Sequence, residues 1–132
     1  MTGNPREAVR NDLLLEALGK PIDLNAVDWR VKHHNPSATR LEVQNETLDA
    51  IRDWVSDGLF RLGALSGASH RFEAWHHSLD HSLHTISHDY VGHYGDPEKW
   101  MYVGWLSLTA QGELLARSIE RKDLDGYRPK AP

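Results

Sequence analysis

Three segments with helical periodicity, separated by glycine and proline breaks, occupy the first 58 residues and most constrain the fold of this chain. Within residues 5–18, 23–34 and 39–57, apolar side chains recur at steps of three and four, the spacing of one face of an α-helix. The breaks are Gly19, Pro21, Asn35, Pro36 and Gly58. The N-terminal half is therefore predicted to be three helices joined by short turns, with Asn4, Asp23 and Ser37 or Thr39 as their N-caps.

The second half of the chain mixes short strand patterns with two more helical patterns. The predicted strands are residues 59–65, 71–75 and 100–108, and the predicted helices are residues 76–92 and 110–122. We therefore expect a single α+β domain over residues 1–122, in which three N-terminal helices precede a small antiparallel sheet and a C-terminal helix. The helix at 76–92 is inserted between two strands, and a mobile polar tail is expected at 123–132.

This order of elements resembles the winged helix-turn-helix superfamily. Asp23-Leu-Asn-Ala-Val-Asp-Trp and Asn35-Pro-Ser resemble the second helix and turn of that fold, and Asp57-Gly-Leu resembles the entry into its first wing strand. Trp105-Leu-Ser-Leu-Thr-Ala-Gln-Gly is similar to the second wing strand entering the last helix. The segment between the two strands departs from the pattern, because an ordinary wing is a short hairpin. The resemblance implies duplex DNA binding with the third helix in the major groove, often by a dimer.

The charge of the predicted third helix does not favour contact with DNA phosphates. Residues 39–58 hold two arginines against five carboxylates, a net charge of −3, whereas phosphate contacts need Lys and Arg. Three side chains in its N-terminal half can still pair with base edges, and the second helix and the wing supply further cations. The candidate DNA-binding residues are Arg30, Lys32, Arg40, Gln44, Asn45 and Arg61.

Two non-enzymatic functions follow from this pattern. The first is a homodimeric DNA-binding protein that regulates transcription, and the second is a protein-interaction adaptor on the same scaffold that does not bind DNA. The chain has none of the His-Glu-x-x-His, Gly-x-Ser-x-Gly or Gly-x-x-x-x-Gly-Lys motifs, so we do not expect an enzyme.

Four histidines of the inserted segment form a regular series that suggests a third function. His77, His81, His84 and His88 follow the spacing i, i+4, i+7 and i+11 and fall within about 60° of one another on a helical wheel. Imidazoles one turn apart can bind a divalent transition metal, and a row of them can also respond to pH. A solvated helix face without a ligand is the third interpretation, so no cofactor is certain.

Composition excludes other classes of protein. Cysteine is absent, which excludes disulfides and thiolate metal sites, and the net charge of −4 is mildly acidic. No apolar run approaches the roughly 20 residues of a membrane span, and the first residues contain no apolar signal core. We therefore expect a cytoplasmic protein whose partner is not a membrane.

Overall fold

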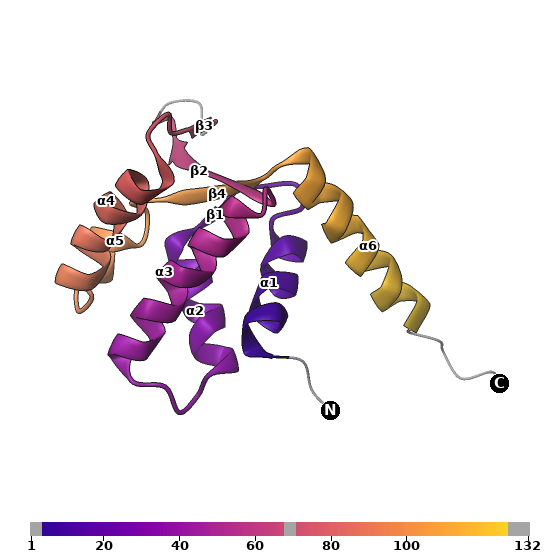
Figure 1. Cartoon of the computed structure of the whole chain (residues 1–132), viewed down its shortest axis with the longest axis horizontal. Helices are drawn as coiled ribbons and strands as arrows, with labels where there is room; N and C mark the ends of the chain where they lie inside the picture. Colours follow the sequence, from indigo (N-terminus) through magenta and orange to yellow (C-terminus); the bar gives the residue numbers. More distant parts are fainter. Residues whose placement is uncertain (1–3, 68–70, 127–132) are drawn as a thin grey trace.

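The structure, a computed structural model of the chain, describes residues 4–67 and 71–126 and has an α+β fold (Figure 1). Its helices are α1 (Pro5–Glu16), α2 (Leu24–His34), α3 (Arg40–Ser56), α4 (Leu79–Gly92), α5 (Pro97–Trp100) and α6 (Ala110–Gly126). Its strands are β1 (Ile22–Asp23), β2 (Phe60–Leu65), β3 (Phe72–Ala74) and β4 (Trp105–Leu108). The predicted layout of three N-terminal helices, a small antiparallel sheet, an inserted helix and a C-terminal helix is confirmed.

The helices begin where the sequence places polar caps. The side chains of Asn4 and Asp23 accept hydrogen bonds from the backbone of α1 and α2, each at 2.8 Å. Thr39 and Glu42 form a reciprocal capping box at the start of α3. Gly58 then ends that helix with a positive φ of 78°, a conformation that other residues rarely adopt. These predicted helix ends are confirmed.

The sheet is antiparallel, and β4 lies inside it. Its strand order is β1-β4-β2-β3, so the last strand along the chain pairs with both the first and the second. Leu106 is the partner of both Ile22 and Leu62 in this register, and all three side chains are buried. The two-residue strand β1 was not predicted, because so short a segment has no periodicity of its own.

The core forms where the apolar faces of the first three helices and α4 meet the sheet. Leu13, Val27, Ile51 and Leu106 are among its fully buried side chains. The predicted inner face of α4 is confirmed, because Leu83, Ile86 and Tyr90 are buried and Leu79 packs partly buried against the core. In the described part of the chain, no helix has the length and apolar character that a membrane span requires.

The structure corrects three predicted boundaries. Residues 100–108 are not one strand: Pro97 starts the short helix α5, and β4 covers only Trp105–Leu108. The inserted helix begins at Leu79 rather than at residue 76, because Ser78 caps it. Helix α6 continues to Gly126, so the first residues of the predicted tail are helical, and residues 127–132 lie outside the described part of the chain.

The direction of α6 is set by a close contact in its first turn. A Cβ added to Gly112 would lie 2.0 Å from the backbone carbonyl oxygen of Leu59, which is too close for any side chain. The glycine therefore lets the start of α6 approach the end of α3 and the start of β2. Thr109 supports the same junction, because its hydroxyl accepts a hydrogen bond from the Gly112 N–H at 2.9 Å.

A buried carboxylate fastens the inserted segment to α2. Asp28 is only 2% exposed, and it accepts hydrogen bonds from the hydroxyls of Tyr90 at 2.6 Å and Tyr94 at 3.1 Å. The ammonium group of Lys32 lies 2.8 Å from the same carboxylate. Burial raises the pKa of both tyrosines, which keeps their hydroxyls protonated as donors. The ring of Tyr94 in turn stacks on Trp100, with 5.3 Å between ring centroids and 6° between planes.

Replacing Tyr90 by Phe removes one donor and leaves the buried carboxylate of Asp28 short of a hydrogen bond. We expect the free energy of unfolding to fall by about 1–3 kcal/mol, the cost of an underpaired buried polar group. Urea denaturation followed by circular dichroism measures the change.

Tyr102→Phe is the matched control, because Tyr102 is 59% exposed and lies outside this network. Its free energy of unfolding is expected to stay within about 0.5 kcal/mol of the wild type. Equal losses in the two variants would show that the bond to Asp28 does not hold the insert in place.

Candidate interaction surface

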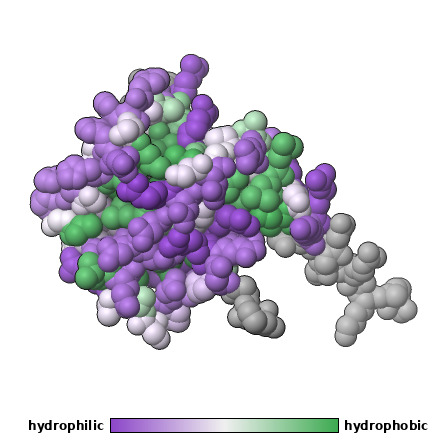
Figure 2. Space-filling view, in the orientation of Figure 1, coloured by the Kyte–Doolittle hydropathy of each residue, from purple (hydrophilic) through white to green (hydrophobic). Residues whose placement is uncertain are grey.

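The outer face of α3 is polar and acidic. Figure 2 shows hydrophilic side chains over this helix, which lies between α1 and α4 in the view of Figure 1. Glu42, Asn45, Asp49, Arg52 and Asp53 are exposed along it. This face is the surface that a DNA-reading helix would present to the duplex, and its exposed carboxylates outnumber its cations.

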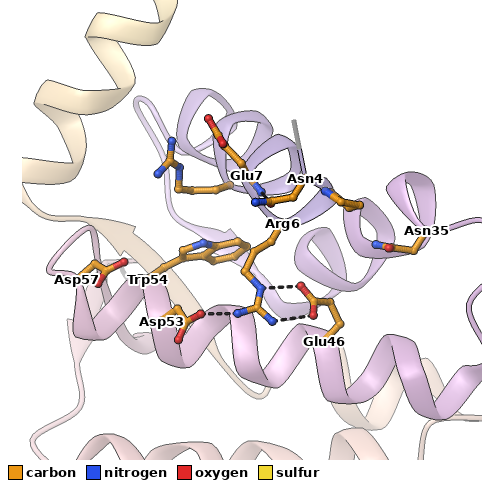
Figure 3. Close-up of a pocket in the computed structure, with 10 residues that line it drawn as sticks. Asn4, Arg6, Glu7, Asn35, Glu46, Asp53, Trp54 and Asp57 are labelled. Atoms are coloured by element: carbon orange, nitrogen blue, oxygen red, sulfur yellow. Dashed lines mark hydrogen bonds and ion pairs between the residues drawn. The ribbon is translucent and has the colours of Figure 1, made fainter. Parts of the chain in front are cut away.

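On one side of this face, an arginine from α1 joins two carboxylates of α3. Arg6 donates from Nε and Nη2 to the two oxygens of Glu46, each at 2.7 Å, and Nη1 pairs with Asp53. Figure 3 shows the guanidinium reaching across a groove of about 530 Å³ to both carboxylates. The hydrogen bonds that Arg6 donates to Glu46 raise the pKa of Arg6, so the guanidinium stays charged. The ion pairs tie α1 to α3 and neutralise part of the acidic face.

On the other side, α4 lies against α3 and lines a second groove. This groove has a volume of about 490 Å³ and receives Asn45, Asp49 and Arg52 from α3. Arg52 pairs with Asp80 at the start of α4, so its charge is also engaged within the chain. The inserted helix thus borders the face of α3 that would enter a DNA groove.

The structure places the two predicted cations of α2 in internal ion pairs. The guanidinium of Arg30 lies 3.3 Å from Glu16 and 3.6 Å from Asp12, both on α1. Lys32 is paired with the buried Asp28 at 2.8 Å. Each cation is therefore already paired within the chain, although the Lys32 side chain is half-exposed.

The other predicted DNA-contacting residues do not form one surface. Arg40, at the start of α3, lies over the Tyr94 ring at 5.0 Å, and Asn45 is exposed on the same helix. Arg61 is on β2, where it lies over the ring of Phe72 at 5.7 Å. Gln44 was expected to be exposed, and this was wrong: its side chain is 3% exposed. It shares the inward face of α3 with Ile51, seven residues along, and cannot reach a base edge from there.

The histidine series is only partly on a helix. His81, His84 and His88 are exposed on α4, whereas His77 precedes the capped start of the helix. His77 still lies beside His81, with 4.6 Å between ring centroids. Among the described residues, no group of three or more His, Asp or Glu side chains converges as a metal site would require. The structure therefore brings together one pair of the predicted metal ligands and not the set of four.

Two residues that organise this surface were missed by the sequence reasoning. Arg6 carries no signal, because its partners on α3 are 40 and 47 positions away. Asp28 does carry a signal in the sequence. Its spacing from Leu24 and Val31 places it on the apolar face of the helix, where a charged residue needs buried hydrogen-bonding partners.

Arg6→Ala removes the guanidinium that joins α1 to α3 and leaves Glu46 and Asp53 without it. Because this arginine is partly exposed, we expect a modest loss, about 1 kcal/mol in the free energy of unfolding. The difference from wild type should shrink at high salt, where like-charge repulsion on α3 is screened. Urea denaturation at low and high salt measures both effects.

Arg10→Ala is the matched control, because Arg10 lines the same groove and its side-chain hydrogen bonds go to the adjacent Asn11. A loss of stability as large as that of Arg6→Ala would contradict the special role of Arg6.

Comparison of the chain with protein-family models finds no match. Neither curated proteins nor solved structures give a match.

Proposed function

We infer that the protein is a non-enzymatic interaction module on a winged helix-turn-helix scaffold, and that the outer face of α3 binds a basic protein partner rather than duplex DNA. The observation that carries this proposal is that two of the four candidate DNA-binding cations are already paired with the chain's own carboxylates. Arg30 and Lys32 are held by α1 and Asp28, while exposed carboxylates remain on α3.

The topology supports the scaffold. The resemblance expects two wing strands, one after the third helix and one before the last helix. Here β1 follows α1 and pairs with β4, and β4 pairs with β2. The α2 and α3 pair is joined by a turn at residues 35–39. This is a likeness of arrangement, and arrangement alone does not decide what a domain binds.

Electrostatics argues against DNA as the ligand of α3. Glu42, Asp49 and Asp53 are exposed along the helix, and a duplex carries one phosphate charge per roughly 1.7 Å of its axis. Approach would place these carboxylates close to phosphates, where like charges repel. The inserted helix α4 also lies beside α3, and the major groove is about 12 Å wide, room for one helix of about 10–12 Å.

The same charges favour a partner rich in Lys and Arg. Complementary charge speeds association and selects among partners more than it adds affinity. The face also contains two apolar side chains that a partner could cover, the exposed Leu41 and the half-buried Leu48. A short basic segment with an apolar residue therefore matches the chemistry of this surface.

Fluorescence anisotropy with a labelled DNA duplex tests the negative half of this proposal. At about 50 mM salt, where phosphate contacts are strongest, we expect no binding at micromolar protein. Binding that weakens steeply with salt and is reduced by Arg40→Ala would overturn the proposal and restore the function of a DNA-binding regulator.

An arginine-rich peptide tests the positive half. Asp49→Lys reverses one exposed charge on α3, and we expect it to weaken peptide binding about threefold to tenfold in isothermal titration at low salt.

Glu98→Lys is the matched control, because it makes the same charge change at an exposed position on α5. Its peptide affinity should remain near that of the wild type. Equal weakening in both variants would mean that only the net charge of the protein attracts the peptide, and the α3 site would be rejected.

A further inference from the structure

A groove lies beside the first half of β2, on the side where the sheet has no neighbouring strand. Strand β3 pairs only with Gly63, Ala64 and Leu65 of β2, and β4 lies on the opposite side. Residues 60–62 are therefore bordered by the end of α3 and by the chain that leads from β3 into α4. This β2-edge groove has a volume of about 340 Å³, which is within the range of small-molecule sites.

Most of the β2-edge groove is lined by apolar side chains. Trp75 lines it and is held in place, because its backbone N–H donates a hydrogen bond to the Leu62 carbonyl at 3.0 Å. A Cβ added to the buried Gly104 would lie 3.7 Å from the indole of Trp75, so the ring also packs against the chain before β4. Other apolar side chains of the lining are Val55, Phe60, Leu62 and Leu79. These walls would shield the apolar body of a ligand from water.

One polar group of the lining is buried without a partner. Ser82 on α4 is 3% exposed, and its hydroxyl forms no hydrogen bond with the described part of the chain. The other hydroxyl of the lining, that of Thr109, is already engaged: it donates to the Gly58 carbonyl and accepts from the Gly112 N–H. A buried hydroxyl that lacks a partner costs free energy, and a polar atom of a ligand would supply the partner.

The ionisable groups of the lining are basic. They are the exposed side chains of Arg61 and His77, and no Asp or Glu of the described residues lines the groove. Arg61 lies over the ring of Phe72 at 5.7 Å and, within the described chain, forms no ion pair with a carboxylate. An anion in this groove would therefore meet an unpaired guanidinium and no like charge from the lining.

We propose that the β2-edge groove binds a small carboxylic acid with an apolar body. The planar guanidinium of Arg61 matches the two oxygens of a carboxylate, which is the pairing that this side chain lacks within the described chain. The apolar body of the ligand lies against Trp75, and the hydroxyl of Ser82 gains a hydrogen-bonding partner. This binding site goes beyond the proposed function, because the exposed carboxylates of α3 do not line it.

Isothermal titration with 2-naphthoate tests the proposal, and the neutral 2-naphthalenemethanol is the matched ligand. We expect the wild type to bind 2-naphthoate with submillimolar affinity and the alcohol roughly tenfold more weakly, because the alcohol cannot form a charge-assisted pair. Arg61→Ala should weaken 2-naphthoate binding roughly tenfold, and Ser82→Ala about threefold, the effect of one hydrogen bond. Because Arg61 is exposed, its substitution leaves the apolar core intact.

Arg40→Ala is the matched control for Arg61→Ala. Arg40 is also exposed, lies over an aromatic ring at 5.0 Å and is absent from the lining of the groove, and its loss changes the net charge equally. Its affinity for 2-naphthoate should remain near that of the wild type. Equal weakening by the two arginine variants would overturn the proposal, because it would reflect net charge alone.

Two further results would also overturn it: no binding of 2-naphthoate at millimolar concentration, or equal affinity for the acid and the alcohol. Neither result would affect the proposed function of α3, because Glu42, Asp49 and Asp53 lie outside the lining of the β2-edge groove.

Discussion

The buried carboxylate of Asp28 is the constraint on which the arrangement of the inserted segment depends. A charge removed from water needs partners, and those partners come from the far end of α4 and the residues after it, Tyr90 and Tyr94, with Lys32 beside them. Because the hydroxyls reach the carboxylate only when the end of α4 lies near α2, this residue of the second helix helps to position the inserted segment. The apolar side of α4 then completes a core that the first three helices leave open.

Most of the fold followed from local signals. Three helices with polar caps, the strand at Phe60–Leu65 and the last helix were predictable because their periodicity and caps lie within a few residues of one another. The errors lie in segments whose conformation is determined by tertiary contacts. Trp100 belongs to a strand by composition, but it lies on the short helix α5, where its buried indole donates a hydrogen bond to the Tyr94 carbonyl at 3.0 Å. The pairing of β1 with β4 joins segments more than 80 positions apart, which no local pattern encodes.

The candidate site was less predictable than the fold, because function depends on which charges find partners. The sequence showed that the third helix is acidic, and the structure places exposed carboxylates along it. The ion pairs between Arg30 and α1 could not be predicted, because the sequence does not show whether a cation faces solvent or a carboxylate of another helix. The exposure of Gln44 was mispredicted for a related reason. A polar residue is buried when its helical spacing places it on the same face as core residues.

The glycine contact at the start of α6 also determines how that helix is oriented relative to the sheet. Because Gly112 fits against the Leu59 carbonyl with no room for a side chain, α6 cannot turn about its axis by one residue without a steric clash. The rotation of α6 about its own axis is therefore fixed at its N-terminal end. A reporter group attached to the exposed side of α6 would therefore keep a constant orientation relative to the sheet. Its orientation in a complex would report the orientation of the whole domain.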